Sequence, residues 1–163
     1  MENKTLENLM AAFAGESQAT RKYEIYSAIA AKEGKANAAK LFKAAADAEK
    51  LHAKKEYELA GKVGKTVENL KDAKAGETYE FESMYPEFIK AAEAEGNKAA
   101  VGAFTFAMKA EEVHAKLYQE ALDNLDESEE AFYYLCPVCG NIEKSVPDKC
   151  FICGVMGSKF IKY

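Results

Sequence analysis

The first 135 residues of this 163-residue chain contain no cysteine, and all four cysteines lie between Cys136 and Cys153. An even scatter would indicate a disulfide scaffold, whereas clustering predicts a metal site in a reducing compartment. No apolar segment follows the first four residues, and no apolar run approaches the roughly 18 residues of a membrane helix. We therefore expect a cytoplasmic protein without a membrane partner. The net charge of -5 argues against nucleic acid as a partner.

Histidine is also scarce, because the chain has only His52 and His114. Both lie in the same string, Ala-Glu-x-x-His-Ala-Lys, which spans residues 48–54 and again residues 110–116, 62 positions later. On a helix, the Glu and His of each string stand at i and i+3 and project from one face. A carboxylate and an imidazole that converge inside a helical bundle suit a transition metal.

The duplication extends beyond this string, since Glu33-Gly34 recurs as Glu95-Gly96 at the same offset. Upstream the offset is 61, so the second copy has gained one residue between residues 77 and 85. An inserted residue inside a helix is commonly absorbed as a π-bulge, which we predict here. Each copy is rich in helix formers and breaks at its glycine, which indicates a helical hairpin. Two hairpins predict a four-helix bundle over residues 1–130, with the acidic residues 123–130 as a solvated helix end and linker.

Residues equally far from a hairpin turn face each other, which selects the groups that point into the bundle. Glu16 should meet the first Glu-x-x-His, and Glu77 or Glu80 should meet the second. The seven candidate ligands are Glu16, Glu49, His52, Glu77, Glu80, Glu111 and His114. This set matches the bundle pattern that holds a pair of iron or manganese ions. The alternative, that these are solvated surface residues, is made improbable by the repetition.

Glu80 breaks the symmetry of the site, because its counterpart in the first copy is Ala19. Four carboxylates balance the charge of two ferrous ions, and a fifth can compensate the charge that oxidation adds. A neutral imidazole suits the reduced state better. We therefore predict that Glu80 binds one iron in the oxidised state and that His52 replaces it on reduction. Glu49 and Glu111, from the two related motifs, are the natural bridges between the metals.

The cysteines form two Cys-x-x-Cys-Gly units, residues 136–140 and 150–154, in a small C-terminal domain that we place at residues 131–163. Paired units at this spacing indicate a tetrahedral metal, and the glycines let backbone N–H groups point at sulfur. The ligands alone do not distinguish iron from zinc, and a structural zinc ribbon is an alternative. The expected small core consists of Phe132, Tyr133, Tyr134, Ile142, Phe151, Ile152 and Phe160.

Taken together, these motifs resemble the rubrerythrin family over nearly the whole chain: a ferritin-like all-α four-helix bundle followed by a rubredoxin-like domain. The matching segments are residues 15–19, Glu49-x-x-His52, Gly76-Glu77-x-x-Glu80, residues 84–86, Glu111-x-x-His114 and the four cysteines, Cys136, Cys139, Cys150 and Cys153. The resemblance implies a non-haem peroxidase that reduces hydrogen peroxide to water. It implies electrons from NAD(P)H, delivered through a reductase or rubredoxin.

The resemblance also implies the metals and their ligands. It implies two irons, oxo- or hydroxo-bridged when oxidised, and one iron held by the four cysteines. Glu16 would be terminal on the first iron, Glu77 and His114 would serve the second, and Glu49 and Glu111 would bridge. Tyr23 and Tyr85 are equivalent in the duplication. They are either core residues or hydrogen-bond partners of the ligating carboxylates.

Assembly follows from the length of the connection between the two copies. In the family, the second and third helices run parallel, which needs a connection along the whole bundle. Only about five residues, 61–65, are available here, and they reach about 17 Å. We therefore predict a domain-swapped homodimer, each bundle taking one hairpin from each chain. The functional alternatives are a ferritin-like iron-oxidising or storage protein and a non-catalytic zinc-ribbon protein.

Overall fold

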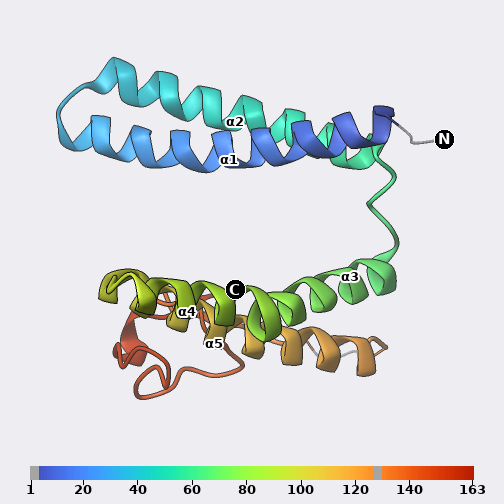
Figure 1. The fold of residues 1–163 in the computed structure, drawn as a ribbon, viewed down its shortest axis with the longest axis vertical. Helices are drawn as coiled ribbons and strands as arrows, with labels where there is room; N and C mark the ends of the chain where they lie inside the picture. Colours follow the sequence, from blue (N-terminus) through green and yellow to red (C-terminus); the bar gives the residue numbers. More distant parts are fainter. Residues whose placement is uncertain (1–3, 127–129) are drawn as a thin grey trace. The chain divides into compact units, whose positions relative to one another are not determined.

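The computed structural model describes residues 4–126 and 130–163, and the chain divides into two compact units, Met1–Gly64 and Lys65–Tyr163. The first unit is a hairpin of α1 (Lys4–Lys32) and α2 (Ala36–Leu59), which lie side by side in Figure 1. Its turn contains Gly34 at φ 71°, a conformation that glycine adopts without strain. This confirms the predicted hairpin and its glycine break.

The contact between α1 and α2 is close because small residues occupy it. Ala30, Ala46 and Ala53 are its buried side chains among the described residues. Near the open end, the rings of Phe13 and Tyr57 stack with centroids 4.5 Å apart. Three buried alanines are a small core for so long a hairpin, and several large apolar side chains of this unit, among them Leu41 and Leu51, are exposed.

The second unit contains a second hairpin. One arm consists of α3 (Thr66–Tyr79), η1 (Glu80–Met84) and α4 (Tyr85–Ala94), and the other is α5 (Lys98–Asp123). The turn again contains a glycine at positive φ, Gly96 at 70°. The segment η1 is a π-helix, which confirms the bulge predicted from the inserted residue.

The duplication is visible in the packing of matching aromatic side chains. In the first hairpin, Tyr26 and Phe42 pack with ring centroids 5.5 Å apart. Their counterparts in the second hairpin, Phe88 and Phe104, pack with centroids 5.6 Å apart. Each pair is joined by the tyrosine that the sequence analysis singled out, Tyr23 or Tyr85.

A small ribbon completes the second unit. Strands β1 (Tyr134–Leu135), β2 (Ile142–Glu143) and β3 (Ile161–Lys162) form an antiparallel sheet in the order β2-β1-β3. A 3-10 turn, η2 (Gly157–Lys159), precedes β3. Two of the expected core aromatics are wrong: Phe151 is 67% exposed and Phe132 is 43% exposed. The buried residues are instead Cys136, Cys150 and Asn141, because the cysteine loops, and not the strands, form the centre of so small a domain.

Two connections bear on the predicted organisation. Helix α2 ends at Leu59 and α3 begins at Thr66, so residues 67–76 are helical and not an extended crossover. After α5 ends at Asp123, part of the predicted acidic linker, residues 127–129, lies outside the described residues. The boundary between residues 130 and 131 therefore stays a prediction.

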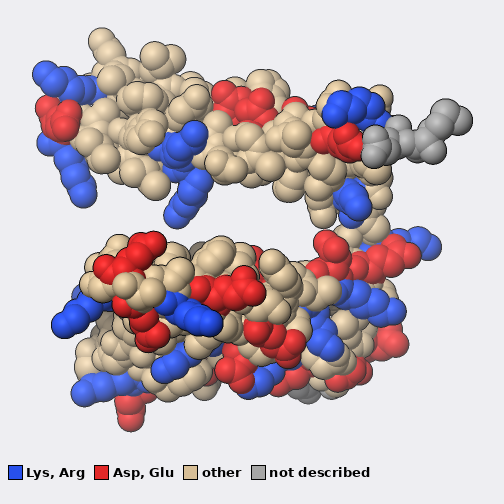
Figure 2. Space-filling view, viewed as in Figure 1, with Lys and Arg blue, Asp and Glu red and all other residues tan. Residues whose placement is uncertain are grey.

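The surface carries charges of both signs. On the face shown in Figure 2, acidic and basic side chains are interspersed over each unit, with no broad basic patch in view. Among the described residues, no helix is long and apolar enough to cross a membrane.

Candidate metal centres

The first hairpin brings together three of the seven candidate ligands. Glu16 comes from α1, and Glu49 and His52 come from one face of α2; one ligand atom of each lies within 4.8 Å of the others. His52 Nδ1 lies 2.8 Å from Glu49 Oε2, and the imidazole side chain is 59% exposed. The pKa of Glu16 is raised, first by its hydrogen bond with Glu49 and then by burial. Two carboxyl groups this close, Glu16 and Glu49, repel each other when both are ionised. A bound cation would relieve that repulsion.

The second hairpin brings together the matching three. Ligand atoms of Glu77, Glu111 and His114 lie within 4.8 Å of one another, and all three side chains are largely buried. Burial and the neighbouring Glu111 charge raise the pKa of Glu77 to about 7. Such a site disfavours two ionised carboxylates without a counter-charge. It suits a divalent cation bound between them.

Glu80 is the seventh candidate, and it lies on the π-helix η1. Its pKa is raised by burial and by the charge of Glu111, so its carboxyl group lies near the other acids of this hairpin. The π-bulge that follows from the inserted residue therefore carries the carboxylate that has no counterpart in the first copy.

His114 has a partner at each ring nitrogen. Nδ1 lies 2.6 Å from Glu111 Oε2 and 3.8 Å from Glu77 Oε1, while Nε2 donates to the carbonyl oxygen of Gly140 at 2.8 Å. Burial alone would lower the pKa of His114, but the bonds to Glu111 and Gly140 raise it. With Nε2 fixed as a donor, Nδ1 can offer its lone pair to a metal, as in many histidine ligands.

The Gly140 bond joins the helical hairpin to the cysteine loops. Gly140 follows Cys139, so one ligand candidate of the carboxylate site is bonded to the backbone beside a cysteine. A mostly apolar cavity of about 300 Å³ lies beside this link, with His114, Tyr118 and Ile142 in its wall. Apolar surroundings strengthen electrostatic interactions across the contact.

The four cysteines converge as their spacing predicts. Ligand atoms of all four lie within 4.8 Å of one another, and the cysteines are free thiols. The Sγ atoms of Cys136 and Cys153 are 3.6 Å apart, and those of Cys139 and Cys150 are 3.5 Å apart. These separations are far longer than a disulfide and fit four sulfurs around one metal ion.

Backbone groups surround the sulfurs in the predicted way. Gly140 and Gly154 both have positive φ, at 81° and 77°. Burial opposes ionisation of Cys150, but the N–H groups of Cys153 and Ile152 lower its pKa to about 7. Asn141 is fully buried, donates from Nδ2 to Glu143 Oε1 at 2.8 Å and lies 3.9 Å from Cys150 Sγ. The sequence analysis did not identify this contribution of Asn141.

The two tyrosines of the duplication differ in their surroundings. The pKa of Tyr85 is raised by burial and by the charges of Glu111, Glu80 and Glu77, so its hydroxyl lies near the candidate ligands. Tyr23 packs against Tyr26 and Phe42. A hydrogen-bonding role for Tyr23 and Tyr85 stays a prediction.

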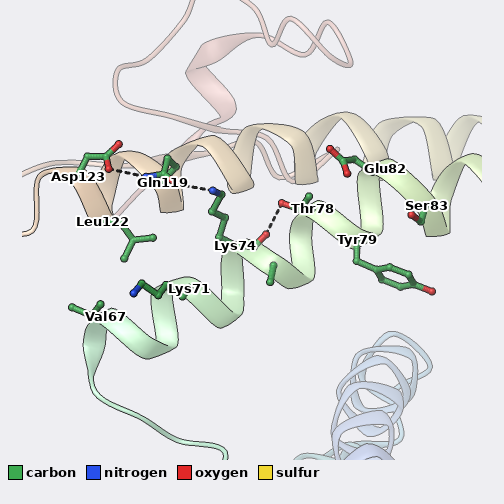
Figure 3. A pocket seen from close by; sticks show the side chains of 11 residues that line it. Val67, Lys71, Lys74, Thr78, Tyr79, Glu82, Ser83, Gln119, Leu122 and Asp123 are labelled. Carbon is green, nitrogen blue, oxygen red and sulfur yellow. Dashed lines mark hydrogen bonds between the residues drawn. The ribbon is translucent and has the colours of Figure 1, made fainter.

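A separate groove of about 970 Å³ runs along α3 and α5. In Figure 3, Lys74 bonds Gln119 across it, at 2.6 Å between Nζ and Oε1, and Gln119 in turn bonds Asp123. The seven candidate ligands do not line this groove. The bond between Lys74 and Gln119 ties α3 to α5.

Comparison with known proteins identifies the family. The rubrerythrin family model matches residues 7–122. The chain belongs to the rubrerythrin family. It is 40% identical to nigerythrin of Nitratidesulfovibrio vulgaris over 91% of this chain and 81% of that protein, and 35% identical to rubrerythrin-2 of Clostridium acetobutylicum over 96% and 95%. A structure of partially reduced nigerythrin matches 98% of this chain and 86% of its own, with a TM-score of 0.61 and 39% identity.

Family membership confirms the predicted fold class and cofactors. The chain is a ferritin-like, four-helix protein with a small rubredoxin-like domain, and it is a di-iron protein with a further iron site at the four cysteines. The donor atoms fit these groups: carboxylates and imidazoles converge in the helices, and four thiols converge in the ribbon.

Proposed function

We propose that this rubrerythrin-family chain is a non-haem di-iron peroxidase that reduces hydrogen peroxide to water. The observation that carries the proposal is the His114 contact, which bonds a residue of the carboxylate site to the backbone beside Cys139. A site that only stored iron would have no need of a one-electron centre hydrogen-bonded to its ligand. Electrons entering the four-cysteine site thus have a short route to the helical site.

The ligand assignment is part of this proposal. Glu16 serves the first iron, Glu77 and His114 serve the second, and Glu49 and Glu111 bridge them. The Glu80 and His52 exchange accompanies a change of redox state. Its support is that Glu80 lies on the π-helix, whereas His52 is the more exposed of the two histidines.

When bound, the irons supply the electrons for cleaving the O–O bond and stabilise the oxygen anions that form. The reaction consumes two electrons and two protons for each peroxide and yields two waters. The residues hold the geometry: Gly140 fixes the ring of His114, and the carboxylates balance the charge. Burial and the charge of Glu111 raise the pKa of Glu77 to about 7, which supports a site that accepts positive charge.

The electron donor belongs to the proposal as well. A rubredoxin, or a reductase that takes electrons from NAD(P)H, would reduce the four-cysteine iron, and this exchange would occur in the cytoplasm. The ribbon suits such a donor because Val138 and Phe151, which adjoin cysteines, are 59% and 67% exposed. An apolar surface around a metal site allows close approach of a redox partner.

We also propose a domain-swapped homodimer. Each hairpin holds three ligand candidates within reach of one another. The connection between α2 and α3 is residues 60–65, which span about 20 Å when extended. That is too short for the parallel arrangement of the second and third helices that the resemblance implies. A second chain would supply the missing hairpin.

The test is anaerobic reduction followed by one equivalent of peroxide per di-iron site. Rapid reoxidation by peroxide, much faster than by oxygen, is expected. Reoxidation no faster with peroxide than with oxygen would favour the iron-oxidising or storage alternative. Metal analysis is the companion measurement: three irons per chain support the peroxidase, while zinc in the ribbon favours a non-catalytic domain.

A further inference from the structure

Glu56 shares the helix face that carries two of the first hairpin's candidate ligands. It follows Glu49 by seven residues and His52 by four on α2, a spacing that repeats on one helix face. Its neighbours hold the helix in place, since Ala53 is buried and the ring of Tyr57 stacks on Phe13. The side chain of Glu56 therefore projects from the face of α2 that carries Glu49 and His52.

The side chain of Glu56 has a buried oxygen without a partner. Its Oε2 is buried and has no hydrogen-bond partner within the described residues. A buried carboxylate oxygen without a donor is costly unless positive charge arrives to compensate it. Together with the spacing on α2, this buried oxygen places a carboxylate beside the first hairpin's candidate ligands.

The duplication shows what Glu56 replaces. Its counterpart in the second copy, 62 residues later, is Tyr118. Tyr118 lines the cavity that His114 also lines, so this position lies beside a candidate ligand in the second hairpin too. One copy has a carboxylate at this position and the other has a phenol.

The two hairpins thereby become equal in composition. The second copy has Glu80 where the first has Ala19, and the first has Glu56 where the second has Tyr118. Each hairpin then offers three carboxylates and one imidazole: Glu16, Glu49, Glu56 and His52 in the first, and Glu77, Glu80, Glu111 and His114 in the second.

We propose that Glu56 is a positioning residue of the di-iron site, which holds negative charge beside the iron that Glu16 and His52 serve. The proposal rests on the ligand set of the proposed function but not on the peroxide reaction. A carboxylate fixed near iron stabilises the ferric state more than the ferrous state. Replacing Glu56 by its neutral isostere should therefore raise the reduction potential of the di-iron site.

The test compares Glu56→Gln with Glu58→Gln in the iron-loaded, full-length protein. Glu58 provides a matched control, because it is on the same helix, is exposed and pairs with Lys54 at 3.6 Å. Both variants lose one charge. Anaerobic redox titration, followed by the electron paramagnetic resonance of the mixed-valence state, measures the di-iron potentials, and the absorbance of the ferric tetrathiolate gives an internal reference.

For Glu56→Gln we expect about a tenfold shift of the ferric-to-ferrous equilibrium, equivalent to about 59 mV for a one-electron step. The tetrathiolate potential should not move, and Glu58→Gln should behave like the unmodified protein. Equal di-iron potentials in all three proteins overturn the proposal, even if peroxide activity is present. If Glu56→Gln fails to fold, Glu56→Tyr, which copies the second hairpin, should show the same rise. A crystal structure of the iron-loaded protein with Glu56 paired to a lysine, away from the metals, also overturns it.

Discussion

Lengthening the connection between the two hairpins should convert the protein from a dimer to a monomer. The arm formed by α3, η1 and α4 has 29 residues, Thr66–Ala94, and is about 43 Å long at 1.5 Å per residue. Residues 60–65 reach about 20 Å, so about 23 Å is lacking for a connection that returns along the arm. Inserting about 14 glycine and serine residues after Gly61 raises the maximum reach to about 70 Å.

The assay is the mass of the iron-loaded protein in solution at low concentration, by size-exclusion chromatography with light scattering. The unmodified chain should be a dimer and the lengthened chain should become monomeric, with the same iron content. An unmodified chain that is monomeric and carries a complete di-iron site would refute the reasoning.

A complementation experiment provides the control for this prediction. Chains with Glu49→Ala should lack an intact di-iron site, and so should chains with Glu111→Ala. If hairpins are exchanged, a mixed dimer of the two variants combines both intact hairpins in one of its two bundles. Co-refolding should then restore di-iron sites. No restoration in verified mixed dimers would show that each chain supplies all its own ligands.

Three further predictions concern the separate parts of the chain. Gly157→Ala should abolish formation of the four-cysteine site, because an added Cβ would lie 1.6 Å from the Pro147 carbonyl oxygen; loss of the ferric tetrathiolate absorbance measures it. Asn141→Ala should lower the reduction potential of that site, since the N–H group near Cys150 Sγ stabilises the reduced state; Ser158→Ala is the exposed control. The metal-free protein should lose stability as pH rises from about 4.5 to about 7, because the folded state holds the Glu77 proton more tightly than the unfolded state; urea midpoints at pH 5 and 7.5 test this, and Glu77→Gln should reduce the difference.

Each of these outcomes has a clear contrary result. A normal tetrathiolate spectrum in Gly157→Ala would mean that the backbone around Pro147 can shift. An unchanged potential in Asn141→Ala would mean that the 3.9 Å approach to sulfur has no electronic effect. A urea midpoint that rises with pH in the metal-free protein would contradict the raised pKa of Glu77.

The sequence predicted those features that local pattern and duplication determine. The glycine turns at Gly34 and Gly96, the two hairpins and the π-helix all follow from offsets between the copies, because helix period and chain length fix them. The convergence of the four cysteines follows from their spacing.

Other features depend on packing between elements that are distant in sequence, so the sequence did not reveal them. The bond from His114 to Gly140 joins residues 26 positions apart and depends on how the ribbon packs on α5. The burial of Asn141 and the exposure of Phe151 reverse the usual preference, because a ribbon this small has its cysteine loops at its centre. Tyr118 was missed although the duplication pairs it with Glu56, since neither residue belongs to the repeated string.

The most direct test of the central claim follows all the irons after a single addition of peroxide. The protein is reduced completely without oxygen, and one equivalent of peroxide per di-iron site is added in a stopped-flow instrument. The account predicts rapid di-iron oxidation, then the slower return of the red ferric tetrathiolate as the cysteine site passes on its electron. In a Cys139→Ser, Cys150→Ser variant the first phase should persist and the red colour should be absent. If the tetrathiolate oxidises first, or if neither site reacts faster with peroxide than with oxygen, the account is contradicted.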